Sequence, residues 1–475
     1  MANDTFYITT PIYYPNAQPH LGHAYSTLVC DALTRYHTQK GEDTYFLTGT
    51  DENTEKVIEA AEKVGENPRV YLDRIVQTFQ ALYANLGIHY TQFIRTSDEA
   101  VHWPGAIEMW KRLEQRGDIY KGEYHGLYCV GCESFITEKE LVDGKCSIHG
   151  TEPKRLSEEN YFFRLSAYTD RIKQIVQDGS LAVTPAVRKH ELLSLLDQGL
   201  EDISFSRPAG AVTWGIPVPG DSSQKMYVWM DALTNYVSAL GFGRGEEGMR
   251  FWPGVHVVGK DILRFHAAIW PAMLLSADLS LPRGILVHGM IISDGKKMSK
   301  SLGNVIDPNE MVSRYGTEAT RYLLLRHVHP FEDTDITRER LDEWYTAGLA
   351  NGLGNLAARI MKMAEDHLDA PVARPEADVF PQEYTDALDR YELQEAADYV
   401  WKQIGILDAR IQETQPFKVV KENPEQGRKM IAELAVELYR IARLLHPFMP
   451  TTSGTIKAAV LENKKPETLF ARVDS

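Results

Sequence analysis

Two histidines near the start of the chain, in the segment His20-Leu21-Gly22-His23, have the type and spacing expected of a phosphate-binding turn. Residues three apart face the same side of a helix, and the first turn of a helix presents free N–H groups that favour phosphate. Gly22 has no side chain, so a flat adenine ring has room against this turn. The alternative is that His20 and His23 are polar residues that cap the helix.

Two lysines flank a hydroxyl group in the segment Lys297-Met298-Ser299-Lys300-Ser301, which follows the turn residues Asp294-Gly295. A loop of this kind suits a movable clamp on a triphosphate, because each ammonium group can form a charge-assisted hydrogen bond with phosphate oxygens. The alternative is a solvated loop. The two segments lie far apart in the sequence, and their joint presence favours a nucleotide site built from two halves of one domain.

A third group of residues predicts a metal site. Cys129-x2-Cys132 is followed, after thirteen residues, by Cys146-x2-His149. Two such pairs supply four ligands in the tetrahedral arrangement that zinc prefers, and four protein ligands leave no open position for catalysis. One structural Zn²⁺ per chain is therefore predicted. Cys30 is expected on the buried side of a helix, as an unligated thiol.

The elements that must position these groups follow from hydrophobic patterns. Residues 5–9 alternate apolar and polar, and Pro11 and Pro15 then break the run, which predicts a strand that ends before Pro11. Apolar residues three or four apart predict a helix over 21–36, and residues 44–48 predict a second strand. A strand, a helix and a strand in about 45 residues favour a βαβ unit and a parallel sheet.

A second unit of this kind is expected downstream, with a strand at 255–258, a helix at 262–275 and a strand at 285–287. Residues 117–226, between the two halves, combine short strands, turns and many charges, which indicates an insertion into a split nucleotide-binding domain. Helical spacing dominates after about residue 340, and Pro447 and Pro450 are expected to stop the last long helix. The fold class is therefore α/β, with an all-helical region at the C-terminal end.

The composition narrows the class of protein. The 475 residues are 43% hydrophobic and 25% charged, as in a globular enzyme, and they include no apolar run long enough to span a membrane. The start of the chain lacks a basic and apolar signal segment, so a cytoplasmic location is expected. A net charge of −15 argues against a protein that coats nucleic acid non-specifically. It is compatible with a local basic surface that binds one RNA partner.

The two nucleotide segments together resemble the HIGH and KMSKS motifs of class I aminoacyl-tRNA synthetases, and the second agrees at all five positions. The resemblance implies that His20 and His23 contact the phosphates of ATP, and that Lys300 with Lys297 neutralises the departing pyrophosphate. It also implies an ATP site that includes Gly22, Gly259 and Asp261, with Mg²⁺ bridging the phosphates.

The amino acid substrate is inferred from a separate set of residues. Apolar and aromatic side chains lie near the predicted active-site loops and suit a polarisable thioether, although each alone is more typical of core packing: Ile12, Tyr14, Trp229, Ala232, Leu233, Tyr236, Ile262, His266 and Trp270. Together with Thr48-Gly49-Thr50-Asp51-Glu52, this set is similar to the methionyl branch of the family, which implies that Asp51 holds the substrate ammonium.

The resemblance covers residues 5 to about 450 and implies five regions. These are the first half of a Rossmann-like catalytic domain (1–116), a connective insertion with the zinc knuckle (117–226), the second half of the catalytic domain (227–292), the KMSKS loop with a stem-contact region (293–345) and a helical anticodon-binding domain (346–475). No RNA-binding module follows in this chain, so a monomer is expected.

The resemblance also implies that Asn355 and Arg359 read the methionine anticodon, and Phe417 stands where many members carry a stacking tryptophan. The alternative is that the first two are ordinary surface residues and that Phe417 packs into the helical core. The expected partners are L-methionine, ATP and tRNA(Met), including the initiator, with no membrane. Two rival readings are a cysteinyl, leucyl, isoleucyl or valyl synthetase and a non-catalytic tRNA-binding protein of the same fold.

Overall fold

The computed structural model describes residues 4–129, 134–136, 138, 141–147, 150–210, 214–298, 304–376 and 379–472. The chain divides into two compact units, each assembled from separate segments. The first comprises Met1–Pro19, Glu42–Ala81 and Tyr90–His288, and the second comprises His20–Gly41, Leu82–His89 and Gly289–Ser475. Within the described part of the chain, no helix is both long and apolar enough to span a bilayer.

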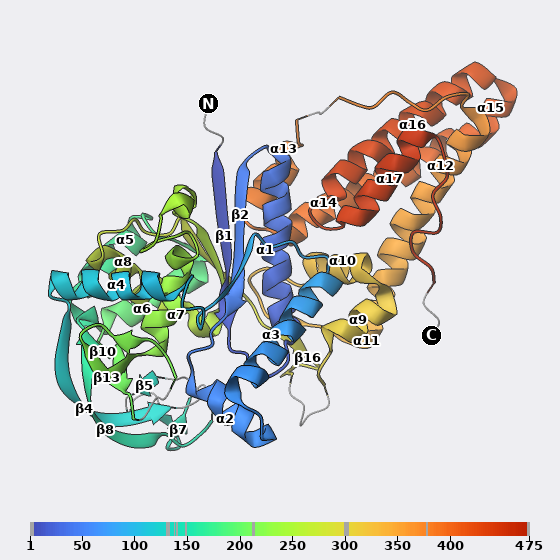
Figure 1. The fold of residues 1–475 in the computed structure, drawn as a ribbon. Helices are drawn as coiled ribbons and strands as arrows, with labels where there is room; N and C mark the ends of the chain where they lie inside the picture. Colours follow the sequence, from blue (N-terminus) through green and yellow to red (C-terminus); the bar gives the residue numbers. More distant parts are fainter. Residues whose placement is uncertain are drawn as a thin grey trace. The chain divides into compact units, whose positions relative to one another are not determined.

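A six-stranded parallel sheet forms the centre of the first unit (Figure 1). Its strands, in spatial order, are β3 (Gln92–Arg95), β2 (Asp43–Thr50), β1 (Thr5–Tyr13), β14 (Val255–Gly259), β15 (Gly284–His288) and β9 (Ala182–Thr184). Every neighbouring pair is parallel. This confirms the α/β fold class, and it shows that the inserted segment returns one strand, β9, to the sheet.

Strand β1 is longer than the sequence pattern predicts. It passes through Pro11 and ends at Tyr13, with a shift of its register against β2 between Thr9 and Ile12. Proline has no N–H to give to a neighbouring strand, and a bulge is one of the few places in a sheet that tolerates it. Beyond the bulge the pairing resumes, and the Asp51 amide donates to the Tyr13 carbonyl at 2.9 Å.

Helices of the first unit pack on the sheet through a continuous apolar core that includes Trp110, Met230 and Trp270, all fully buried. These helices are α4 (Trp103–Arg116), α5 (Thr169–Gln177), α6 (Ala186–Asp197), α7 (Val228–Ser238) and α8 (Trp270–Ser276). Two further helices, α2 (Glu55–Val64) and α3 (Pro68–Asn85), follow β2.

The helix predicted over 262–275 is present, since residues 263–276 are continuously helical, but it is not regular. A 3-10 turn at Lys260–Ile262 and a π-helical segment at Phe265–Ile269 precede α8. Pro271 lies in the first turn of α8, where its missing N–H and its ring prevent a regular α-helical bond to the preceding turn. A wider π turn accommodates that defect, and such segments are frequent at functional sites.

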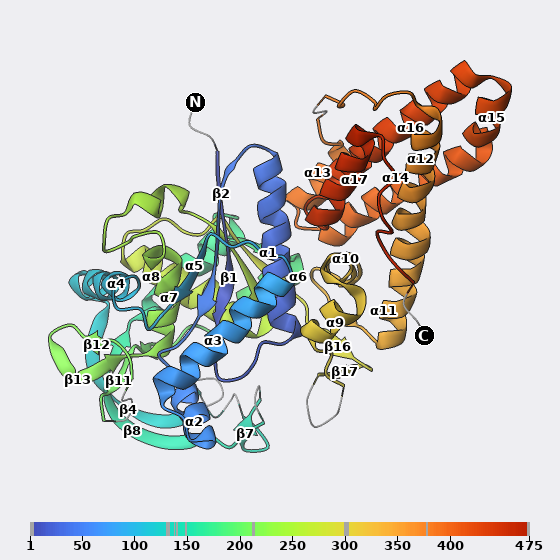
Figure 2. The same ribbon diagram turned by 45° about the vertical axis from the view of Figure 1, so that its right-hand side comes forward.

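The inserted segment contains several short strands, as its turn-rich sequence predicts, and the structure pairs them into antiparallel sheets. The long strands β4 (Ile119–Cys129) and β8 (Lys154–Phe163) run side by side in Figures 1 and 2. Shorter strands complete these sheets: β5 (Ser134–Ile136), β6 (Leu141–Val142), β7 (Lys145–Cys146), β10 (Ile203–Ser204), β11 (Ser206–Pro208), β12 (Pro217–Val218) and β13 (Asp221–Met226).

The second unit is mainly helical. It contains α1 (Leu21–Gln39), α9 (Pro308–Tyr315), α10 (Thr317–His327), α11 (Arg338–Tyr345), α12 (Asn355–His367), α13 (Gln382–Asp389), α14 (Leu393–Thr414), α15 (Pro416–Glu422), α16 (Pro424–Leu445) and α17 (Pro450–Glu462). A small sheet joins β16 (Ile291–Ser293), β17 (Lys296–Lys297) and β18 (Thr334–Asp335). As predicted, the long helix α16 ends before Pro447 and Pro450, and Pro450 then opens a further helix, which suits a residue with no N–H to donate.

A buried ion pair lies inside the second unit. The Arg321 guanidinium, fully buried on α10, contacts the Asp31 carboxylate of α1 at 2.6 Å. Arg321 also donates to the backbone carbonyls of Leu86, Pro447 and Phe448. A buried charge is tolerated only with such complete pairing, so this contact fixes α1 within the unit. Cys30, beside Asp31, is fully buried, as the helical pattern predicts.

Candidate functional site

The order in which the strands follow one another reverses between β1 and β14. On one side of this line, β1, β2 and β3 follow one another outward, and on the other side β15 follows β14 outward. In open α/β sheets, ligands bind beyond the carboxyl ends of the strands at such a switch point. The predicted residues Ile12 and Tyr14 lie at the carboxyl end of β1, Asp51 follows β2, and Gly259 ends β14. The first unit therefore brings these residues to one edge of one sheet.

The two carboxylates that follow β2 have different environments. Glu52 is fully buried and accepts hydrogen bonds from Arg95 Nε at 2.8 Å and Thr50 Oγ1 at 2.5 Å. Its charge is therefore balanced by an ion pair inside the protein. Asp51 is also buried, with 2% of its surface exposed, and its backbone is held against the end of β1.

Aromatic side chains line the same edge. The rings of Trp229 on α7 and Phe265 on the π-helical segment stack at 3.6 Å between centroids and 10° between planes. Ile12, Trp229 and Ile262 are only partly buried and pack against the main core. Tyr14 belongs to a smaller cluster with Tyr128, Tyr227 and Trp229. Phe265, which the sequence reasoning did not single out, thus belongs to the same aromatic group as Trp229.

Tyr236 and two buried histidines pack ring against ring, and each histidine also has hydrogen-bond partners. The Tyr236 hydroxyl lies 2.7 Å from His266 Nε2, and His266 Nδ1 lies 3.0 Å from the Ile262 carbonyl. His266 therefore donates through Nδ1 and accepts through Nε2. His256 lies between Thr9 Oγ1 at 2.8 Å and Trp270 Nε1 at 3.1 Å. Ala232 and Leu233, also predicted for the methionine site, are buried in the same core.

Burial keeps both imidazoles neutral. It lowers the pKa of His266 to about 4, although the hydrogen bond to Ile262 and the nearby Asp261 carboxylate oppose this shift. Burial and the neighbouring His266 lower the pKa of His256 well below its ordinary value. A neutral ring has one donor and one acceptor, so each histidine has a fixed role in this group.

Gly259 and Asp261 are close neighbours at the end of β14. A Cβ atom on Gly259 would lie 2.6 Å from Asp261 Oδ1, so only glycine allows this carboxylate position. Asp261 is exposed, and Gly259 is partly exposed. Both are accessible at the carboxyl edge of the sheet.

In the second unit, His20 and His23 form the first turn of α1. The His20 Nδ1 atom accepts from the Gly22 amide, and His23 Nδ1 accepts from the His20 amide, each at 3.1 Å. The two rings stack with centroids 3.7 Å apart, and a Cβ on Gly22 would lie 3.0 Å from the His20 ring. The helix-cap role considered from sequence is therefore present.

This cap also fixes the chemistry of both rings. An Nδ1 atom that accepts must be unprotonated, so a neutral ring holds its proton on Nε2. Burial and the adjacent His20 ring lower the pKa of His23 well below its ordinary value. His23 is therefore neutral at physiological pH, with Nε2 as its donor.

The lysine-rich segment begins in a hairpin of the second unit. Lys297 pairs with Ile292 across β16 and β17. Lys300 lies outside the described residues, as do Ser299 and Ser301. Two of the four predicted zinc ligands, Cys132 and His149, lie outside the described residues as well.

The other two predicted zinc ligands lie close to each other. Cys129 ends β4 and Cys146 ends β7, and both are buried in one small cluster with Leu127 and Ile136. The Cys146 backbone makes a turn in which its carbonyl accepts from the Gly150 amide at 2.8 Å. The described residues alone contain no group of three or more metal-binding side chains.

The predicted anticodon residues lie on α12 and α15. Asn355 is exposed, and Arg359, one turn later, is partly buried, with Nη1 at 2.5 Å from Asp408 Oδ1 of α14. Phe417 is 39% exposed, so it does not belong to the helical core. The alternative that Phe417 packs into the core is therefore wrong.

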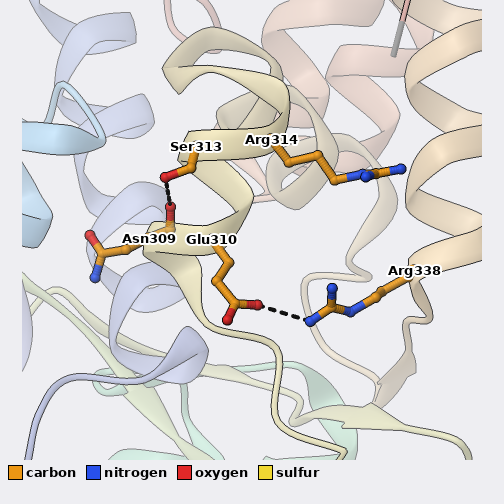
Figure 3. A pocket seen from close by; sticks show the side chains of 5 residues that line it. All are labelled: Asn309, Glu310, Ser313, Arg314 and Arg338. Carbon is orange, nitrogen blue, oxygen red and sulfur yellow. Dashed lines mark hydrogen bonds and ion pairs between the residues drawn. The ribbon is translucent and has the colours of Figure 1, made fainter. Parts of the chain in front are cut away.

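A separate pocket of about 610 Å³ lies on the second unit between α9 and α11 (Figure 3). Asn309, Glu310, Ser313, Arg314 and Arg338 line it, and none of the predicted site residues does so. Its two arginines are engaged, Arg338 with Glu310 and Arg314 with Asp342. Both pairs link α9 to α11.

Comparison with known proteins adds independent findings. The sequence model of a family described as class I tRNA synthetases (M) matches residues 6–148 and 136–361. A methionine–tRNA ligase of Caldanaerobacter subterraneus subsp. tengcongensis is 40% identical, over 99% of this chain and 79% of the relative. One of Brucella suis is 38% identical over 95% of this chain and 91% of the relative.

Solved structures agree with these sequences. The structure of Mycobacterium tuberculosis methionyl-tRNA synthetase with methionyl-adenylate superposes with a TM-score of 0.88 at 37% identity, covering 95% of this chain and 93% of that one. The free form of the same enzyme superposes with a TM-score of 0.85 at 32% identity, covering 100% and 99%.

Proposed function

The chain belongs to the methionine–tRNA ligases, a family of class I tRNA synthetases, and on that premise we propose how its residues divide the reaction. The enzyme activates L-methionine with ATP to methionyl-adenylate and pyrophosphate, and then transfers the methionyl group to the 3′-terminal adenosine of tRNA(Met). Activation needs no protein nucleophile, because the methionine carboxylate itself attacks the α-phosphorus. Positioning and electrostatics therefore supply the rate.

We propose that methionine binds at the carboxyl edge of the sheet, with its ammonium on Asp51. The observation that carries this proposal is the position of Asp51, which is buried directly after β2 at the same edge of the sheet as Ile12 and Tyr14. The partly buried rings of Trp229 and Tyr14, with Ile12 and Ile262, offer apolar surface to the thioether. Ala232, Leu233, Tyr236 and His266 support that surface from behind.

For ATP, we propose that the Nε2 donors of His20 and His23 contact the phosphates. Their caps on the α1 turn support this, because fixed Nδ1 acceptors leave the proton on the other nitrogen. Gly259 and Asp261 are proposed to line the adenosine site, with Gly22 close to the base, and Mg²⁺ enters as the ion that ATP carries.

Lys300, with Lys297, is proposed to neutralise the departing pyrophosphate. Lys300→Ala should lower the rate of adenylate formation about a hundredfold, while methionine binding changes little, because the charge that it meets grows only as the bond breaks. Single-turnover pyrophosphate release measures the rate, and the exposed Lys464 provides a control substitution in the same unit. Equal rates for Lys300→Ala and the parent enzyme at saturating ATP would exclude this role.

A structural zinc ion is proposed on Cys129, Cys132, Cys146 and His149. The burial of Cys129 and Cys146 in one cluster supports it, because soft sulfur ligands must converge around a zinc ion. The ion would hold the short strands of the inserted segment together. Elemental analysis of protein purified without chelator should find one zinc per chain, and Cys146→Ser should lose it, whereas Cys30→Ser should keep it.

We propose that Asn355, Arg359 and Phe417 bind the anticodon of tRNA(Met), including the initiator. We also propose that the enzyme works in the cytoplasm. The exposure of Asn355 and Phe417 supports the anticodon role, because base stacking and base-edge contacts need accessible groups.

Pyrophosphate exchange with all twenty amino acids tests the assigned substrate. Exchange driven best by methionine is expected, and exchange driven best by cysteine or a branched-chain amino acid would contradict it.

A further inference from the structure

A chain of buried polar side chains connects the segments that carry Asp51 and Trp229, two residues of the proposed methionine site. Of its members, only Asp231 lies in a segment that resembles the methionyl branch, residues 227–233. Asp231 of α7 lies between Asn53 and His102: its Oδ2 accepts from Asn53 Nδ2 at 2.7 Å, and its Oδ1 lies 2.5 Å from His102 Nε2. His102 Nδ1 then lies 2.7 Å from Ser238 Oγ, and Asn53 also donates to the Thr96 carbonyl at 2.9 Å.

All members are inaccessible to solvent. His102 and Ser238 are fully buried, Asp231 is 1% exposed and Asn53 is 4% exposed. A buried carboxylate is stable only while its donors remain in place, since losing one leaves charge without compensation. The positions of Asn53 and His102 are therefore set by Asp231, and its position is set by theirs.

The network joins the two parts of the proposed site. Asn53 lies two residues after Asp51, and Asp231 lies two residues after Trp229 on the helix that also carries Leu233 and Tyr236. His102 immediately precedes α4, and α4 and α7 approach so closely that a Cβ on Gly105 would lie 2.5 Å from the Ser238 Cβ. The packing of these helices leaves little freedom for an alternative arrangement.

We infer that Asn53, Asp231 and His102 are positioning residues that fix the distance between the ammonium anchor and the thioether surface. The inference rests on the proposed role of Asp51. None of the three touches substrate in this account. They act through the chain, because a shift of Asn53 or Asp231 also shifts Asp51 or Trp229, each two residues away. A misplacement of about 1 Å in an active site can lower the reaction rate about a hundredfold.

The test compares the KM for methionine with the KM for ATP in pyrophosphate exchange. In Asp231→Asn, one of the two acceptor oxygens becomes an amide donor, so either the hydrogen bond from Asn53 is lost or His102 must change tautomer in order to accept. We expect the KM for methionine to rise about tenfold or more, with the KM for ATP changed less than about twofold. Asn53→Ala and the milder Ser238→Ala should show smaller shifts in the same direction.

Thr234→Val is the matched control. Thr234 is equally buried on α7, and its hydroxyl bonds only to the Met230 carbonyl, one turn earlier. It should lower the thermal midpoint without separating the two KM values. If Asp231→Asn, Asn53→Ala and Ser238→Ala all raise both KM values together, or raise neither, the positioning role is wrong; should the first two not fold, Ser238→Ala decides.

Asp51→Asn separates this inference from its premise. A raised KM for methionine in Asp51→Asn, with parent-like values in the network variants, overturns the positioning role alone. A parent-like KM in Asp51→Asn removes the ammonium role and, with it, the inference.

Discussion

The carboxyl edge of the parallel sheet and the surface of α12 and α15 are proposed to recognise two very different substrates, and they are built differently. At the sheet edge, the polar groups beside the proposed site are buried and have fixed partners, as for Glu52 with Arg95 and His266 with Tyr236. On the helices, Asn355 is exposed, Phe417 is 39% exposed, and Arg359 has an accessible partner in Asp408.

The difference follows from the size and dynamics of the ligand. Methionine offers few atoms, so its recognition depends on groups that are held in place before it arrives. An unstacked RNA base offers a large flat face and several polar edges, and it can be met by side chains that adjust on contact. Substitutions at the sheet edge should therefore have larger effects than substitutions on the helices.

The strongest test of this contrast is Asp51→Ala. Removing a buried anion that pairs with the ammonium should raise the KM for methionine by roughly a hundredfold or more, equivalent to about 3 kcal/mol. The KM for tRNA in aminoacylation should stay within about twofold of the parent value, because the anticodon residues are untouched. A tenfold change in the KM for tRNA would break the comparison.

Lowering the pH should reduce the stability of the fold through the buried histidines beside the sheet edge. The folded-state pKa of His266 is about 4, below the ordinary value of 6.5, so the unfolded chain binds more protons between these values. Stability is therefore lost as pH falls through this window, by about 2 kcal/mol at pH 5 for this one residue. Thermal midpoints measured between pH 7 and pH 5 should fall less steeply for His266→Gln than for the parent.

The exposed His190 of α6 supplies the control, since His190→Gln should keep the parental slope. His327 and His446 of the second unit also have lowered pKa values, about 3 and about 4, because both are largely buried. The parent slope therefore includes contributions from both units, and the difference between parent and variant isolates the share of His266. An identical slope for parent and His266→Gln would contradict the assignment.

On the helical surface, Phe417→Ala should raise the KM for tRNA about tenfold, because one stacked base contributes about 1–3 kcal/mol. Pyrophosphate exchange should be unchanged. Ile406→Ala, at another exposed apolar side chain that is 54% accessible, is the matched control and should leave both reactions unaltered. If Phe417→Ala charges tRNA normally, or loses both reactions through unfolding, its stacking role is wrong.

The smallest effect is expected for Asp408→Asn. The Arg359–Asp408 pair is accessible, and such pairs contribute less than about 1 kcal/mol to stability, so the thermal midpoint should barely move. Freed from its partner, Arg359 should bind RNA slightly better, lowering the KM for tRNA about twofold. Asp398 lies on α14, as Asp408 does, and pairs with Arg326. Asp398→Asn therefore controls for the change of charge. A weakened affinity for tRNA would show that Asp408 orients Arg359.

The sequence predicts the elements whose patterns are local. The strand, helix and strand of the first βαβ unit, the antiparallel insertion and the long C-terminal helices can all be recognised from spacing. The passage of β1 through Pro11 and the π turn before Pro271 could not be predicted, because neighbouring strands and helices decide whether a proline defect is absorbed or ends an element.

Site residues follow the same division. His20, His23 and Asp51 are singled out by their segments, whereas no role for Asn53, His102 or Asp231 follows from the sequence. These three are far apart in the sequence, each is an ordinary polar residue in its local context, and only the fold brings them within hydrogen-bond distance. The accessible state of Phe417 also depends on tertiary packing, because its local sequence is compatible with both a buried and an exposed ring.

The interleaving of the two units along the chain has a consequence for synthesis and for fragments. The chain passes from one unit to the other at Pro19–His20, Gly41–Glu42, Ala81–Leu82, His89–Tyr90 and His288–Gly289, so no single cut releases an intact unit. A fragment that begins at Gly289 keeps Arg321 and lacks Asp31, which leaves a buried guanidinium without its counter-charge. On the ribosome, α1 emerges early and must wait for α10 before its ion pair can close, so nascent chains stalled before Arg321 should be sensitive to protease within α1.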